Sequence, residues 1–158
     1  LNFEAMRDGM LQVSGELDLT MHGPSQKLEI KPSSKRRAVY GYLDRQNISP
    51  TLNSFDFANP NIHAPKRVET TVPQQALFAF NHPFVIERSA SLAKRALESR
   101  NAESSSMVEF LYRQVLSRNP RKDEIKLGAE FLTNDAKLAN LEDLAQTLLV
   151  SNEFFFTD

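Results

Sequence analysis

From Pro73 to its end, the sequence is a succession of amphipathic segments, and this pattern restricts the fold to a mainly α-helical one. Apolar residues recur three and four positions apart, the spacing that places them on one face of a helix. The clearest stripe follows Asn140, which we expect to cap its helix, and consists of Leu141, Leu144, Ala145, Leu148 and Leu149. Short helices of this kind bury their stripes against each other, which predicts a small helical bundle.

Prolines set two further helix boundaries. Pro73 and Pro83 suit the first position of a helix, which predicts helices over 73–80 and 83–99. The apolar face expected for the second of these helices consists of Ile86, Ala90, Ala93 and Leu97.

Two more helix starts are expected near the C-terminal end. The residues from Ser106 to Glu109 have the form of a capping box, which predicts a helix from there to Leu116. Asn119-Pro120 is expected to cap the next helix, with Asp123 and Glu124 in its first turn, where the helix dipole favours negative charge.

The first half of the chain is less regular. Residues 1–13 have helical periodicity, and Gly15 is placed to end that helix. Residues 37–43 and 67–72 are rich in β-branched or aromatic residues, which predicts a short two-stranded β ribbon. Residues 37–43 also fit a helix, and both readings stay open.

These patterns divide the chain into an irregular part with the ribbon and helices (1–100) and a three-helix unit (101–158), packed as one domain. Because the sequence starts inside a helical pattern, we expect it to be the C-terminal part of a longer protein.

Composition excludes several kinds of site. The chain has no cysteine, so thiolate chemistry and cysteine-bound metals are excluded. Its three histidines are far apart, which predicts no metal site and no cofactor. The chain has nineteen basic and twenty acidic residues, and this balance gives no positive field that would attract nucleic acid, so we expect no nucleic-acid partner. No apolar run is long enough for membrane insertion.

Six polar residues are the candidates for a functional or structural hub. They are Asp56, Arg67, Glu69, Thr71, Gln74 and Gln75. In a structural role, Thr71 would cap the helix that begins at Pro73, the glutamines would hold the loop 47–65, and Ala76 and Leu77 would enter the core. In an enzymatic role, Asp56 between two aromatic residues would act as an acid or base.

Several motifs occur together in a characteristic order. They are Arg36-Arg37-Ala38-Val39-Tyr40, Phe55-Asp56-Phe57, Arg67 with Thr70-Thr71-Val72-Pro73-Gln74-Gln75-Ala76-Leu77, Asn81-His82-Pro83-Phe84, and Leu116-Ser117-Arg118-Asn119-Pro120 followed by Ser151-Asn152-Glu153-Phe154. In this order they resemble the planctomycete surface-protein domain known as domain of unknown function 1553. Many members of that family have cysteine before the position of Arg67, where this chain has Ile62-His63-Ala64.

The resemblance implies a C-terminal module of a large exported protein, located outside the cytoplasm. Its expected partners are the upstream domains of the same protein, with a cytochrome-c-like domain often among them. We therefore expect a non-catalytic role in domain packing or protein interaction. The alternative is part of an extracytoplasmic redox or polysaccharide-related enzyme, whose site Asp56, Arg67, Glu69 and Gln74 would share with upstream residues.

Overall fold

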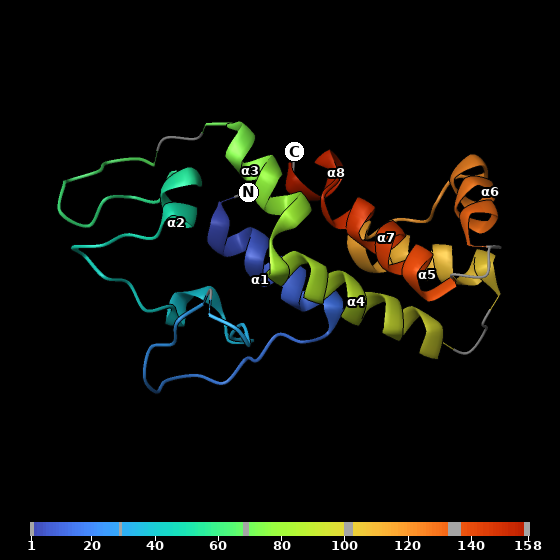
Figure 1. Cartoon of the computed structure of the whole chain (residues 1–158), viewed down its shortest axis with the longest axis horizontal. Helices are drawn as coiled ribbons and strands as arrows, with labels where there is room; N and C mark the ends of the chain where they lie inside the picture. Colours follow the sequence, from blue (N-terminus) through green and yellow to red (C-terminus); the bar gives the residue numbers. More distant parts are fainter. Residues whose placement is uncertain (1, 29, 68–69, 100–102, 133–136, 157–158) are drawn as a thin grey trace.

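The computed structural model describes residues 2–28, 30–67, 70–99, 103–132 and 137–156, and its regular structure within these ranges is helical. The prediction of a mainly α-helical fold is confirmed (Figure 1). The elements are α1 (Phe3–Ser14), a 3-10 helix η1 (Ala38–Tyr40), α2 (Pro50–Ser54), α3 (Pro73–Asn81), α4 (Pro83–Glu98), α5 (Ser104–Leu116), α6 (Lys122–Phe131), α7 (Lys137–Leu149) and α8 (Asn152–Phe155).

Helix α4 is the central element. It contacts α1 and α3 from the first half of the sequence, and α5 and α7 from the second. Its buried face consists of Phe84, Val85, Arg88, Ser89, Leu92, Ala93 and Ala96. The predicted face was therefore wrong in part, because Ile86 is 47% exposed. A helix covered by α1 on one side and α7 on another buries a broader stripe than a surface helix does.

Helix α1 ends at Gly15 as its sequence predicts, but it begins at Phe3, after an Asn2 cap that was not predicted. The side chain of Asn2 accepts a hydrogen bond from the N–H of Ala5 at 2.9 Å. At the other end Gly15 adopts the left-handed conformation (φ 76°), and its N–H bonds the last turn of the helix.

The predicted β ribbon is wrong, since no strand occurs in the described part of the chain. Residues 38–40 form η1 instead, and the segment makes only isolated bridges, from Arg36 to Asp18 and from Gly41 to Gln26. It therefore pairs with the loop that precedes it, which satisfies its backbone groups without a second strand. In the other predicted strand, Val68 and Glu69 lie outside the described residues.

Three expected helix caps were also wrong. Helix α5 begins at Ser104, before the expected capping box, and α6 begins at Lys122, with Arg121 and not Asn119 at its N-cap. Asn140 lies inside α7, and its amide donates to the carbonyl of Phe131 at 2.9 Å. That carbonyl is in the last turn of α6, where backbone oxygens lack helical partners.

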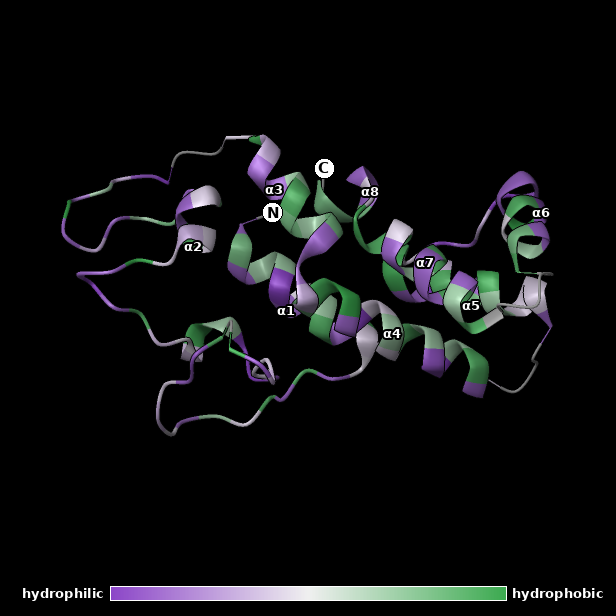
Figure 2. Cartoon of the chain, viewed as in Figure 1, coloured by the Kyte–Doolittle hydropathy of each residue, from purple (hydrophilic) through white to green (hydrophobic). Residues whose placement is uncertain are grey.

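The stripe of α7 packs into the core, as predicted. Leu141, Ala145, Leu148 and Leu149 are buried, whereas Leu144 is only partly buried. Figure 2 shows hydrophobic and hydrophilic residues alternating along the helices, as expected for helices with one covered face. The core combines side chains from both halves of the sequence, from Phe3 to Phe154.

Candidate functional site

The loop between α2 and α3 is held by Asp56. Asp56 follows the C-cap of α2 and adopts the left-handed conformation (φ 54°), which aspartate tolerates better than most residues. Its carboxylate accepts the N–H of Thr70 at 2.6 Å and the Thr70 hydroxyl at 2.8 and 2.9 Å. One side chain thereby closes the loop that starts at α2.

Gln75 in α3 makes a second connection to the same loop. Its amide nitrogen donates to the carbonyl of Ser54 at 2.9 Å and to that of Thr70 at 3.1 Å. Gln75 thus holds part of the loop 47–65 in the way expected from its sequence.

Arg67 connects the end of this loop to α1. Its two terminal nitrogens donate to the two carboxylate oxygens of Glu4 at 3.0 and 2.9 Å, and the guanidinium lies 4.9 Å from the ring centroid of Phe57. The hydrogen bonds to Glu4 raise the pKa of Arg67. Paired donation of this kind fixes the orientation of both side chains.

Thr71 and Gln74 do not join these contacts. Thr71 is exposed and α3 has Val72 at its N-cap without a side-chain hydrogen bond, so the predicted cap was wrong. Gln74 is exposed, and Glu69 lies outside the described residues. Leu77 is 61% exposed and Ala76 is exposed as well, so neither enters the core. The backbone leaves Thr70, and not Thr71, facing Asp56.

An aromatic cluster supports these polar contacts. Phe3, Phe55 and Phe78 have ring centroids 5.4 to 6.0 Å apart and join α1, the end of α2 and α3. His82 stacks on Phe78 at 4.3 Å, and its Nδ1 accepts the N–H of Phe84 at 3.2 Å, which caps α4. The histidine therefore has a structural position.

Buried arginines form a second polar region, which sequence reasoning missed. Arg36 is only 7% exposed. Its guanidinium donates to the carbonyls of Thr20 (3.0 Å), Pro24 (3.2 Å) and His22, and it lies 4.0 Å from the ring centroid of Tyr40. The planar guanidinium presents its donors in a rigid fork, so one arginine side chain bonds several carbonyls of this loop at once.

Arg7 lies on α1 and Arg88 on α4, and both guanidinium groups lie over the ring of Phe84. Their guanidinium carbons are 5.3 and 5.2 Å from the ring centroid of Phe84. Arg88 also pairs with Glu16 at 3.0 Å. Burial acts to raise the pKa of Glu16, but hydrogen bonds from Lys35 and Ser91 and the charge of Arg88 outweigh it and lower the pKa. This carboxylate is therefore held in its charged form.

The C-terminal half contains a third polar cluster, centred on Arg118. The guanidinium donates to both carboxylate oxygens of Glu124 (2.8 and 2.9 Å) and of Glu153 (2.5 and 3.0 Å). Its carbon is 5.1 Å from the ring centroid of Tyr112. Hydrogen bonding to Arg118 lowers the pKa of Glu124 to about 2. The loop after α5 is thereby tied to α6 and α8.

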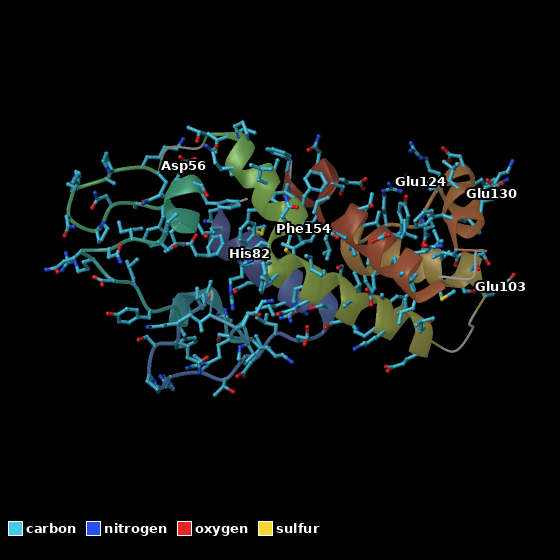
Figure 3. The ribbon with its side chains drawn as sticks, viewed as in Figure 1. Asp56, His82, Glu103, Glu124, Glu130 and Phe154 are labelled. Atoms are coloured by element: carbon cyan, nitrogen blue, oxygen red, sulfur yellow. The ribbon has the colours of Figure 1, made fainter. Side chains whose placement is uncertain are left out.

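These regions lie apart. Figure 3 shows Asp56 near α2 at one end of the molecule and Glu124 at α6 near the other. A cavity of about 410 Å³ opens between α2, the start of α1 and the loops before and after η1, and none of the five candidate residues that the structure describes lines it. Within the described ranges, no group of three His, Asp or Glu side chains is placed to bind a metal, and no helix is long and apolar enough to cross a membrane.

The contacts of Asp56 and Arg67 indicate what these side chains can do chemically. Both carboxylate oxygens of Asp56 accept hydrogen bonds from Thr70, and the charge of Arg67 is matched by Glu4. In both arrangements the hydrogen bonds join one segment of the chain to another. Their geometry suits structural connections.

The family comparison agrees with the motifs. A model described as "Protein of unknown function (DUF1553)" matches residues 1–132. The chain belongs to the DUF1553 family. No curated protein and no solved structure matches it.

In this DUF1553 domain, separate sequence motifs meet in space. The Phe-Asp motif contacts the Thr-x-x-Pro motif through Asp56 and Thr70, and the Arg-Arg-x-x-Tyr motif stacks Arg36 on Tyr40. Arg118 likewise meets Glu153, although Glu153 lies beyond the residues that the family model matches. The residues of these motifs therefore make contacts that hold the fold together.

Proposed function

We propose that this DUF1553 domain is a non-catalytic module of a larger exported protein and packs against the upstream domains of that protein. The observation that carries the proposal is the use of the candidate polar side chains. Asp56, Arg67 and Gln75 each connect one backbone segment to another, and none of them lines the cavity. An enzymatic site would instead bring such groups together in a concave pocket.

The surface of α3 supports a packing role. Leu77 and Phe80 are 61% and 59% exposed and lie three positions apart, so they share one side of the helix. Helix α3 is attached to α7, because Gln146 in α7 donates to the carbonyl of Phe80 at 2.8 Å. Exposed apolar side chains on a firmly held helix are typical of an interaction surface.

The test uses the longer protein that contains this domain. Leu77→Asp and Phe80→Asp are introduced together, and contact with the upstream domains is measured by cross-linking and mass spectrometry. Leu127→Asp, at an exposed leucine of α6, is the matched control. We expect cross-links to α3 to be lost in the double variant and kept in the control.

Two results would contradict the proposal. Cross-links that are unchanged in the double variant would mean that α3 is not the packing surface. An activity of the longer protein that is lost in Asp56→Asn while the melting temperature is unchanged would favour an enzymatic role. Export is tested separately, by locating the protein in fractions of the producing cells.

A further inference from the structure

The cavity between η1 and α2 has the features of a ligand site. Its volume of about 410 Å³ lies in the range of small-molecule pockets. Its walls are apolar side chains that also contact the core, namely Phe3, Leu28 and Leu52. Such walls exclude water from one face of a bound molecule while the opening stays accessible.

Lys27, Tyr42, Asp44 and Asn47 place exposed polar groups at the opening of the cavity. Within the described residues, the ammonium of Lys27, the hydroxyl of Tyr42 and the side-chain amide of Asn47 make no hydrogen bond, although all three line the cavity. Asp44 uses one carboxylate oxygen for the N–H of Gln46 at 2.9 Å, and its second oxygen is unused there. Elsewhere in this loop region, polar side chains such as Arg36 are bonded to backbone carbonyls.

The chemistry of these groups selects a class of ligand. Lysine only donates, a carboxylate only accepts, and a hydroxyl or an amide does both. A ligand that satisfies all of them carries several groups that each donate and accept, as sugar hydroxyls do. The charges of Lys27 and Asp44 balance, which favours a neutral ligand. The ring of Tyr42, 54% exposed, offers a flat apolar face at the same opening.

We propose that this cavity binds a neutral saccharide, with Tyr42 stacked on the sugar ring and Asp44, Asn47 and Lys27 bonded to its hydroxyls. The site is distinct from the α3 surface and does not depend on the proposed packing role. It is a binding site without a catalytic step.

The test is a titration of the full chain, labelled with ¹⁵N, with glucose, cellobiose and maltose, followed by backbone amide NMR shifts. We expect at least one sugar to shift the amides of residues 27–28 and 42–47 in a saturable way. Tyr42→Ala is expected to weaken binding about tenfold, the effect of losing one aromatic contact of about 1.4 kcal/mol. Val39→Ala, at a 72% exposed residue that does not line the cavity, is expected to bind normally.

Other outcomes overturn the proposal. No saturable shift with any of the three sugars contradicts it, as do shifts confined to residues outside the cavity. Inorganic phosphate and free lysine are titrated in parallel, and saturation by either at these amides with none by sugars would assign the cavity to a charged ligand. Asp44→Asn keeps the shape of the side chain, so unchanged sugar affinity in both Asp44→Asn and Tyr42→Ala would also reject the assignment.

Discussion

Arg118 donates a hydrogen bond to each carboxylate oxygen of Glu124, and this pair ties the loop after α5 to the first turn of α6. Glu124 also accepts the N–H of Arg121 at 2.6 Å, so one side chain serves both the ion pair and the start of the helix. The sequence places Glu124 in that first turn correctly, but its partner across the loop is a property of the folded chain.

This pair makes a pH prediction. Hydrogen bonding lowers the pKa of Glu124 from 4.5 to about 2, so its contribution to stability is complete above pH 4.5 and is lost as the pH falls towards 2. We expect Glu124→Gln to lower the free energy of unfolding at pH 7 by about 1 kcal/mol. Thermal melts should show that wild type and variant converge near pH 2. The control is Glu109→Gln, because Glu109 is exposed and its ion pair with Arg113 is long, at 4.0 Å. A difference between wild type and Glu124→Gln that stays constant at every pH would refute the prediction.

The core face of α7 gives a second prediction. Leu148 is 5% exposed, and we expect Leu148→Ala to lower the free energy of unfolding by about 2 to 5 kcal/mol through lost burial and a new cavity. Leu138→Ala on the same helix, at a residue 44% exposed, should change it by less than about 1 kcal/mol. Urea titration measures both, and equal midpoints for the two variants would show that Leu148 is not in the core.

Two neighbouring threonines give a third prediction. Both threonines are exposed, but Thr70 bonds Asp56 through its hydroxyl, whereas Thr71 caps no helix. We expect Thr70→Ala to lower the free energy of unfolding by about 1 kcal/mol and Thr71→Ala to leave it nearly unchanged. Thermal melts of the two variants decide, and a larger loss in Thr71→Ala would show that the loop is held differently.

The buried ion pair gives a fourth prediction. Removing Arg88, which is 4% exposed, leaves the carboxylate of Glu16 short of a partner, and we expect Arg88→Ala to lose about 3 kcal/mol. The double variant Glu16→Gln with Arg88→Met should recover part of that loss, because neither charge is then left buried. Arg113→Ala is the control, at a side chain 60% exposed. Chemical denaturation measures all three, and a mild effect of Arg88→Ala alone would mean that Lys35, Ser91 and water are sufficient partners for Glu16.

The helices could be predicted because their signals are local. Pro73 and Pro83 stand at first helical positions, and Gly15 ends α1, as residues of those types do in most proteins. The face that α4 buries was not predictable in the same way. Arg88 reads as a surface residue in sequence, and its burial depends on Glu16 and Phe84, which the fold brings to it.

The irregular half shows the same limit. Residues 37–43 have the composition of a strand. In the structure Arg36 instead donates hydrogen bonds to carbonyls of the preceding loop, and residues 38–40 form η1. In the candidate region, the sequence indicated which segments meet, since Asp56 and Gln75 do contact the loop between α2 and α3. Glu69 lies outside the described residues. Which of Thr70 and Thr71 faces Asp56 depends on a shift of one residue, and composition does not determine it.

The position of α4 has a consequence for cutting the polypeptide. Because α4 packs against α7 as well as against α1, the peptides on either side of a break between Ser99 and Ser104 would still share one apolar interface. We expect a chain nicked there to elute as one particle in gel filtration, and the two peptides, produced separately, to reassemble when mixed. The connection after α4 is then a place to insert a tag or a reporter, and a pair of fragments could report on assembly inside a cell.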